Sequence, residues 1–156
     1  MDRGDFNWIV PTKLLAMSSP STKMMDAKGF RVYTPEDYTP VFRRQNVSCV
    51  IRLNEEEYDR EKFIKGGINH YDLQFPDGSC PEDHIIEQFI EIVDSESGCA
   101  VHCMAGLGRT GTLIGCWVLR NYDITAREFI AWCRIVHPGS IIGPLQHFLL
   151  EYEAQI

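Results

Sequence analysis

Two kinds of apolar pattern alternate along this chain. Short apolar runs of strand length lie at residues 7–17, 47–53, 68–75 and 100–102. The first run is divided by Pro11, which lacks a backbone N–H, so the run predicts an edge strand or a hairpin. The other three runs predict further strands, because turn residues or helix signals bound each of them.

Between and after these runs, apolar positions recur with the spacing of a helix. The predicted helices span residues 34–45, 59–65, 81–95, 109–121, 125–136 and 144–156. Thr34 and Pro35 form a start signal for the first, and a capping box from Thr125 to Glu128 starts the fifth. Strands alternating with helices predict an α/β fold. We expect a central mixed sheet of about four or five strands flanked by helices, in one domain over residues 1–156.

Composition and charge limit the partners of this domain. The 156 residues are 44% apolar and 24% charged, which is ordinary for a globular protein, and the net charge is −7. Nucleic acids and anionic membranes attract basic surfaces, so we expect neither as a partner, and we expect a monomer. Acidic residues concentrate at 55–61 and 82–87. They form either a solvated face or an acidic rim that contacts basic residues of a protein substrate.

The six cysteines do not form a metal-binding pattern. They occupy positions 49, 80, 99, 103, 116 and 133, mostly within apolar runs, and no pair has C-x-x-C spacing. The sequence therefore predicts no metal and no other cofactor. We expect free thiols, no signal peptide and no membrane span, which together predict a reducing compartment, the cytoplasm or the nucleus.

One stretch combines several groups that bind or attack phosphate. Residues 102–111 have the pattern H-C-x-x-G-x-x-R-T-G, between an apolar strand end and the start of a helix. A glycine loop at a helix start directs backbone N–H groups at an anion, and Arg109 adds a planar fork for two phosphate oxygens. Cys103 lies in this positive field, which predicts a thiolate nucleophile of depressed pKa. The residues predicted to hold the phosphate are Met104, Ala105, Gly106, Leu107, Gly108 and Arg109.

Two other interpretations compete for this stretch. The nucleotide-binding phosphate loop needs G-x-x-x-x-G-K-[ST], and residues 102–111 contain no lysine, so that loop is excluded. A buried structural cysteine beside a glycine-rich turn remains the alternative, since a free cysteine usually belongs to a core. The glycines, the arginine and the hydroxyl at fixed offsets favour the nucleophile.

The leaving oxygen of a phosphate ester needs a proton donor, and the best candidate is Asp77. It lies in the Pro/Gly-rich loop 75–81, and such a loop can place an acid over a site. Asp-Gly is also a favoured turn pair, so the local pattern leaves a turn aspartate equally open. Asp83 is the second candidate acid, and it also fits an ordinary carboxylate in the first turn of a helix.

Four further side chains are candidates for supporting roles. Thr110 is placed to donate a hydrogen bond to the Cys103 sulfur, or it simply begins the helix. His102 precedes the nucleophile on a strand, so alternation directs it away from the phosphate. We expect a buried ring bonded to backbone, which either shapes the loop and tunes the thiolate or is purely structural. Gln146 either positions the attacking water or is an exposed helix residue. Cys80 is a possible disulfide partner for an oxidised Cys103.

These residues resemble the cysteine-dependent protein phosphatases, and more narrowly the mitotic-exit dual-specificity phosphatases of the cell-division-cycle type. The matching motifs are His102–Gly111, Asn7–Pro11, Val50–Asn54, His70–Leu73, Asp77–Ser79 and Pro138–Pro144. The resemblance covers the chain from about residue 7 to its end. It implies the phosphatase fold, a metal-free two-step mechanism, a role in the cell cycle, Asp77 as general acid and Gln146 as the residue that orients water.

The chain departs from that family in three places. Members usually carry a related domain ahead of the catalytic one, and the groove between the two selects phosphoserine followed by proline and a basic residue. We expect that first domain to be absent here, which predicts a stand-alone enzyme. Met104 replaces the usual signature lysine, and Leu145 replaces a glutamine of the late loop. The low positive charge of the loop opposes inositol-lipid substrates.

The sequence therefore predicts a protein phosphatase that hydrolyses phosphotyrosine, and also phosphoserine and phosphothreonine, in phosphoprotein substrates. Cys103 attacks phosphorus, Asp77 protonates the leaving oxygen, and water then cleaves the phosphocysteine intermediate. A second hypothesis keeps this chemistry on an RNA 5′-phosphate or a phosphoinositide, which the acidic balance opposes. A third is a catalytically silent phosphoprotein-binding module, although nucleophile, arginine and acid are all present.

Overall fold

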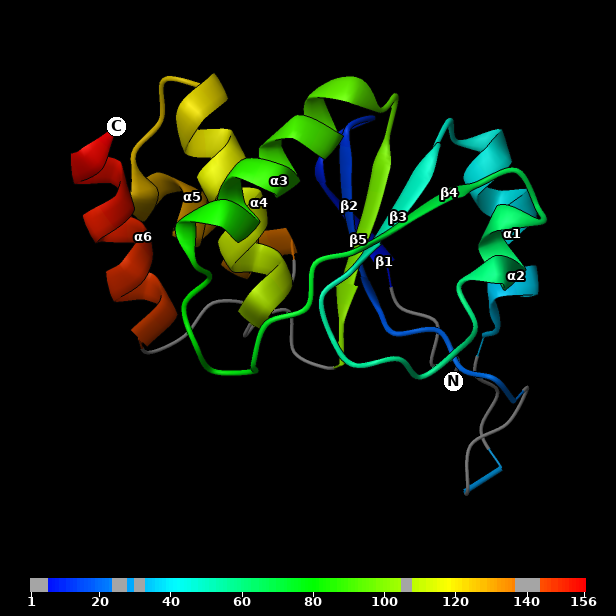
Figure 1. Ribbon diagram of the computed structural model, residues 1–156. Helices are drawn as coiled ribbons and strands as arrows, with labels where there is room; N and C mark the ends of the chain where they lie inside the picture. Colours follow the sequence, from blue (N-terminus) through cyan, green and yellow to red (C-terminus); the bar gives the residue numbers. More distant parts are fainter. Residues whose placement is uncertain (1–5, 24–27, 30–32, 105–107, 137–143) are drawn as a thin grey trace.

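The centre of the structure is a five-stranded mixed sheet (Figure 1). The computed structural model describes residues 6–23, 28–29, 33–104, 108–136 and 144–156. The strands are β1 (Phe6–Val10), β2 (Leu14–Ser18), β3 (Cys49–Arg52), β4 (Asn69–Asp72) and β5 (Cys99–Cys103). Their order is β1-β2-β5-β3-β4, with β1 antiparallel to β2 and all other neighbours parallel. The predicted mixed sheet is confirmed, and the carboxyl ends of its four parallel strands share one edge.

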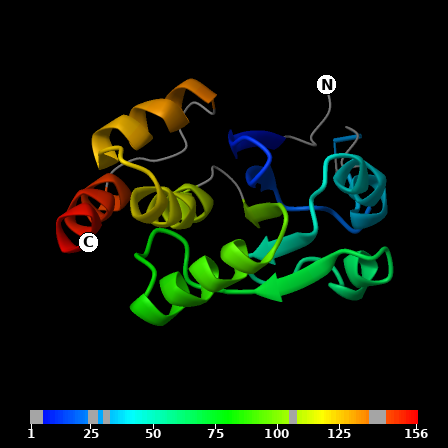
Figure 2. The same cartoon turned by 90° about the horizontal axis from the view of Figure 1, so that it is seen from above.

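Helices cover both faces of the sheet (Figures 1 and 2). The helices are α1 (Pro35–Arg44), α2 (Glu61–Ile64), α3 (Asp83–Ser95), α4 (Gly108–Asn121), α5 (Ala126–Val136) and α6 (Pro144–Gln155). The first two lie on one face, and the other four lie on the opposite face. All six predicted helices are present, and together with the sheet they confirm the α/β fold with flanking helices.

Local start signals act as the sequence predicts. The Thr34 hydroxyl caps α1 by accepting from the Asp37 N–H at 3.3 Å, and Asp37 Oδ2 accepts from the Thr34 N–H at 2.9 Å. Thr125 and Glu128 exchange the same two bonds before α5. Such boxes satisfy backbone donors that the first helical turn leaves open.

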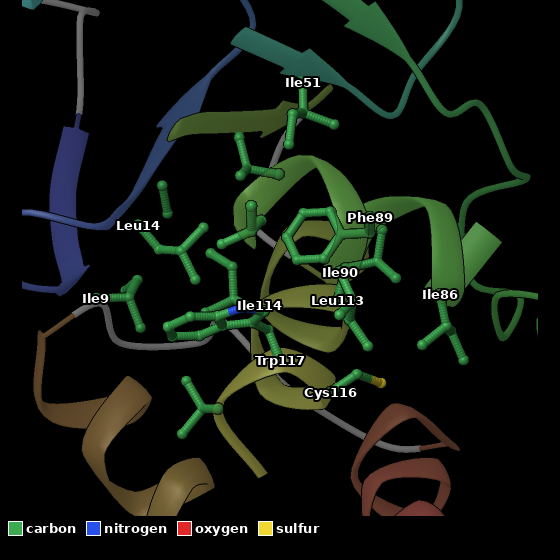
Figure 3. Close-up of a cluster of buried hydrophobic side chains, with 14 of the residues drawn as sticks. Ile9, Leu14, Ile51, Ile86, Phe89, Ile90, Leu113, Ile114, Cys116 and Trp117 are labelled. Carbon is green, nitrogen blue, oxygen red and sulfur yellow. The ribbon is translucent and has the colours of Figure 1, made fainter. Parts of the chain in front are cut away.

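Strand alternation divides the core into two clusters on the two faces of the sheet. On β2, Leu14 and Ala16 join the cluster under α3 to α6, whereas Leu15 and Met17 join the cluster under α1 and α2. Figure 3 shows the first cluster, in which Leu14 and Ile9 lie on one side of α4 and Phe89 of α3 lies on the other. The same alternation on β5 places Cys103 in the α4 cluster and directs His102 to the opposite face. The predicted orientation of these two neighbours is therefore confirmed.

Helix α4, which begins beside the candidate nucleophile, is held on three sides. A Cβ at Gly115 would lie 2.8 Å from the Phe129 ring and 3.0 Å from a Leu149 methyl, so only glycine allows α5 and α6 to approach this closely. Trp117 Nε1 donates to Asp94 Oδ1 at 2.9 Å and anchors α4 to α3. The middle of α4 is thus packed against α3, α5 and α6. Within the described residues, no helix has the length and apolarity needed to cross a bilayer.

Candidate active site

The thiol of Cys103 lies where β5 meets α4. Its side chain is 2% exposed, and the Thr110 hydroxyl donates to Sγ at 3.3 Å. The 14-residue α4 begins at Gly108, so the positive end of its dipole faces this region. The structure thereby brings together the predicted nucleophile and the predicted hydroxyl donor. Of the predicted phosphate-binding loop, Ala105, Gly106 and Leu107 lie outside the described residues, and exposed Met104 and half-buried Gly108 flank them.

Arg109, which precedes Thr110 in the first turn of α4, is buried and is fixed by main-chain carbonyls. Its NH1 donates to the carbonyl of Phe75 at 3.0 Å and, more weakly, to that of Leu53 at 3.4 Å. These carbonyls follow β4 and β3, so the sheet edge itself orients the guanidinium. Nε of Arg109 is buried and has no hydrogen-bond partner among the described residues. A buried donor of this kind is satisfied when an anion oxygen approaches it.

Asp77 is the acid that the structure places against Arg109. Its Oδ1 lies 3.8 Å from Arg109 Nε, while its side chain remains largely exposed. Asp77 occupies a tight turn closed by a bond from the Ser79 N–H to the Pro76 carbonyl at 3.2 Å, and Gly78 has the positive φ of 77° that favours glycine. Asp77 is therefore a turn residue and also a neighbour of Arg109, so the two interpretations of this aspartate do not exclude each other. Asp83, the other candidate acid, is exposed in the first turn of α3.

His102 is completely buried behind the nucleophile. A backbone hydrogen bond with Cys103 acts on its ring, as the sequence predicts. Nε2 also lies 2.8 Å from the Tyr58 hydroxyl, a partner that the sequence did not predict because Tyr58 is distant along the chain and reaches the ring only through the fold. Burial lowers the pKa of His102 to about 3, so the ring is neutral near pH 7.

Sequence reasoning missed the residues that surround His102. Tyr58 bonds in turn to His70 Nε2 at 2.7 Å, and buried Arg52 donates to Asp72 through Nε at 2.5 Å and NH2 at 3.2 Å. Arg52, His70 and Asp72 occur within motifs that carry the family resemblance. Their grouping follows from the parallel register of β3, β4 and β5, which local sequence patterns do not reveal.

Helix α6 brings Gln146 to the same end of the molecule. A Cβ at Gly108 would lie 3.1 Å from Cδ1 of buried Leu145, so the first turn of α6 packs on the first turn of α4. Gln146, the next residue, is half-buried. Cys80 is exposed in the loop that carries Asp77, and both Cys80 and Cys103 are free thiols here, so the role of Cys80 as a partner for an oxidised Cys103 stays a hypothesis. Within the described ranges, no group of three or more His, Cys, Asp or Glu residues is arranged to hold a metal ion.

A family model described as "Polymorphic toxin system, DSP-PTPase phosphatase" matches residues 25–123. The chain belongs to the DSP-PTPase phosphatase family. Among curated DSP-PTPase relatives, it is 52% identical to the dual specificity protein phosphatase CDC14AB of Danio rerio over 157 aligned residues. It is 51% identical to CDC14A of Homo sapiens. These alignments cover 100% of the chain but 26% of each relative, so the chain spans about a quarter of the length of the relatives it matches. The resemblance inferred from the motifs is confirmed.

Solved structures agree on the fold. Tk-PTP in its active form superposes with a TM-score of 0.73 and 23% identity, covering 97% of both chains. Kinase associated phosphatase, with its catalytic cysteine replaced by serine, superposes with a TM-score of 0.76 and 15% identity, covering 97% of this chain and 94% of that one. At such identities the likeness establishes the DSP-PTPase fold alone.

Proposed function

We propose that this chain is a cysteine-dependent protein phosphatase acting on phosphotyrosine and on phosphoserine and phosphothreonine. One observation carries the proposal: the Cys103 thiol accepts a hydrogen bond from Thr110 at the start of α4, beside buried Arg109 and the Asp77 carboxylate. A thiol, a fixed guanidinium and a carboxyl group that can donate and accept a proton are the groups that phosphate-ester cleavage needs. The names of the relatives, dual specificity and tyrosine-protein phosphatases, support the same chemistry.

Binding begins with the phosphate at the amino end of α4. Arg109 binds phosphate oxygens, and its buried Nε gains the partner that it lacks among the described residues. The carbonyls of Phe75 and Leu53 hold the other side of the guanidinium, so little side-chain entropy is lost on binding. When the phosphate binds Arg109, it replaces Asp77 as the partner of the guanidinium, and the Asp77 side chain can approach the leaving oxygen.

The first chemical step transfers the phosphoryl group to sulfur. Cys103 Sγ, as thiolate, forms the S–P bond while the P–O bond to the substrate breaks. Protonated Asp77 gives its proton to the leaving oxygen, which departs as an alcohol or phenol. The charge that spreads over the phosphoryl oxygens is stabilised by Arg109 and the helix dipole, as phosphoryl transfer requires.

The second step returns the enzyme to its starting state. Asp77, now a carboxylate, removes a proton from water, the water oxygen bonds to phosphorus, and the P–S bond breaks. The Thr110 hydroxyl stabilises the departing thiolate, because it already donates to Sγ. We assign Gln146 to orienting the water, on the support of its place in the first turn of α6, which packs against Gly108.

The test of this function is steady-state phosphate release from three peptides of matched sequence. They carry phosphotyrosine, phosphothreonine, or phosphoserine followed by proline and a downstream lysine, with Cys103→Ser as the blank. We expect turnover of phosphotyrosine and of at least one of the other two. Turnover confined to a 5′-phosphorylated RNA or a phosphoinositide would contradict the protein-phosphatase assignment, and one-to-one binding without release would indicate a silent module.

A further inference from the structure

Helix α5 has two apolar faces, and one of them is turned to solvent. The inner face, which packs on the core, carries Ala126, Phe129, Ile130 and Cys133. The helix contacts α4, α6 and β1, and it lies on the outside of the helical layer (orange in Figure 2). On the outer face, Ala131, Trp132 and Ile135 follow one another at helical spacing and are all exposed. A helix that only covers a core needs one apolar face, so this second face indicates a contact surface.

Exposed apolar side chains gather around this face. Six large apolar side chains are exposed among the described residues, and three of them are Tyr122, Trp132 and Ile135. Ile135 is the most exposed of the six, at 74%. Tyr122 follows the end of α4 and reaches the same region, because it lines one hollow together with Trp132. Single exposed apolar residues are common on protein surfaces, but a group of three large ones on one face favours a binding role.

The hollow beside the outer face of α5 has apolar walls and a fixed aromatic side chain. Its volume is about 310 Å³, and Ile9, Val10 and Pro11 form the wall on the side of β1. Trp132 Nε1 donates to the Ile9 carbonyl at 2.9 Å, so the indole is held in place at the rim of the hollow. A partner that packs on this ring has little side-chain entropy to remove, and tryptophan often dominates the binding energy of interfaces.

Two arginines border the apolar stripe on the side away from β1. Arg127 and Arg134 are seven residues apart, so they lie along one edge of the helix, and both are exposed. Arg127 forms no salt bridge with another described residue. Ala131 lies between this edge and Ile135, and its small side chain leaves room for the backbone of a partner. The edge therefore offers guanidinium groups to carboxylates that lie beside apolar anchors.

The acidic residues near the stripe are confined to the amino end of α5. Glu128 Oε1 accepts from the Thr125 N–H at 2.8 Å, so this carboxylate serves the helix start, and Asp123 precedes it. The acidic concentrations at 55–61 and 82–87 belong to other elements, the segment that leads into α2 and the start of α3. At physiological salt, charges interact mainly over about 10 Å, so the arginine edge acts locally although the chain is acidic overall.

These charges select among the partners that could cover the stripe. A second copy packed antiparallel about a two-fold axis would place the two arginine edges side by side, where like charges repel. An anionic bilayer would attract the arginines, but Asp123, Glu128 and the net charge of −7 oppose it. A protein segment with apolar side chains along one side and acidic side chains along the next edge matches both the stripe and the arginines.

We propose that the outer face of α5, with the hollow beside it, binds an acidic amphipathic segment of a partner protein. Apolar side chains of the segment contact Ile135 and enter the hollow beside Trp132, and its carboxylates pair with Arg127 and Arg134. The surface includes no residue of the candidate active site, so this inference stands or falls independently of the proposed function.

The test uses two labelled helical peptides of about 18 residues that share their leucines, spaced three and four residues apart. The acidic peptide has glutamate at its polar positions, and the basic peptide has lysine there. Binding to the full chain is measured by fluorescence anisotropy. We expect the acidic peptide to bind at least about tenfold more tightly than the basic one, because the arginine edge attracts one and repels the other.

Two variants of α5 and two matched variants of α2 locate the binding site. We expect Ile135→Glu to weaken the acidic peptide at least about tenfold. Arg127→Glu should weaken the acidic peptide and strengthen the basic one, a reversal that loss of apolar contact alone would not produce. The controls are Ile64→Glu and Lys65→Glu, exposed residues on the opposite face of the sheet, and we expect neither to change binding. All four positions are exposed, so the variants should fold.

Four results would overturn the proposal. They are no binding of the acidic peptide, equal binding of both peptides, unchanged binding in Arg127→Glu, and equal losses in the α2 controls. Sedimentation velocity and vesicle flotation examine the other occupants. A dimer that Ile135→Glu dissociates would assign the stripe to a second copy, and flotation with phosphatidylserine vesicles that the same change abolishes would assign it to a membrane. Either of these would also replace the proposed partner.

Discussion

The two ends of the parallel strands are both polar, but they differ in how completely their polar groups are paired. At the amino end, the Glu96 carboxylate accepts from the Ser48 hydroxyl at 2.7 Å, the Tyr71 hydroxyl at 2.7 Å and the Asn69 amide at 3.0 Å. Lys13 Nζ donates to the Glu96 carbonyl at 2.7 Å. Partial burial alone would raise the pKa of Glu96, but these hydrogen bonds lower it below its ordinary value.

At the carboxyl end, the guanidinium of Arg109 keeps a buried donor without a hydrogen bond. Among the described residues, Arg109 Nε is a buried side-chain atom with no hydrogen-bond partner, and it does not belong to the Glu96 cluster. The amino end is therefore a saturated structural cluster, whereas the carboxyl end keeps a donor that a substrate phosphate can use.

The sharpest contrast between the two ends is expected from Cys103→Ser. A serine hydroxyl is a much weaker nucleophile than a cysteine thiolate, so we expect phosphate release to fall by at least about 10⁴-fold while phosphopeptide binding persists. The measurement is steady-state release together with calorimetric binding of a phosphotyrosine peptide. Residual turnover within tenfold of the unchanged enzyme would show that the nucleophile lies elsewhere.

Asp77→Asn should have the next largest effect. Removing the proton donor should lower kcat by about 10²- to 10³-fold on alkyl phosphates, and less on aryl phosphates whose leaving groups need little protonation. Asp83→Asn is the control, because Asp83 is exposed in the first turn of α3. A larger loss from Asp83→Asn than from Asp77→Asn would reverse the assignment of the acid.

Parts of the site can be predicted from local sequence, and other parts cannot. The loop from His102 to Gly111 is local, so nucleophile, arginine and hydroxyl follow from spacing, and Thr34 and Thr125 mark helix starts by local capping chemistry. Strand alternation likewise predicts that His102 and Cys103 face opposite ways. The partners of His102 depend instead on the register of three strands, and no local pattern encodes the approach of Tyr58 to two histidines.

Glu96→Ala tests the structural half of the comparison. The change leaves Ser48, Asn69 and Tyr71 without their shared acceptor, and we expect the free energy of unfolding to fall by about 2 kcal/mol. The measurement is urea denaturation, with kcat on a phosphotyrosine peptide as the second readout. We expect kcat to change by less than about twofold, since the cluster lies at the opposite end of the strands. A loss of turnover without loss of stability would break the division between the two ends.

The buried histidines predict a dependence of stability on pH. The folded pKa of His102, about 3, lies below its ordinary value of 6.5, so the unfolded chain binds more protons at acid pH. This contribution is fully present above pH 6.5 and is lost as pH falls toward 3. His102 alone should remove about 2 kcal/mol between pH 7 and pH 5. His70 acts in the same direction, so His70→Phe should flatten the curve, whereas exposed His147→Gln should not.

The most direct test of the whole account is rapid-quench mass spectrometry during turnover of a phosphotyrosine peptide. The account predicts a burst of one dephosphorylated peptide per chain and one phosphoryl group on Cys103, more persistent when Gln146 is replaced by alanine. Cys103→Ser should show neither burst nor adduct. Sustained phosphate release with no phosphorylated Cys103 at any quench time would contradict the assignment of the carboxyl end of the sheet as the site of covalent chemistry.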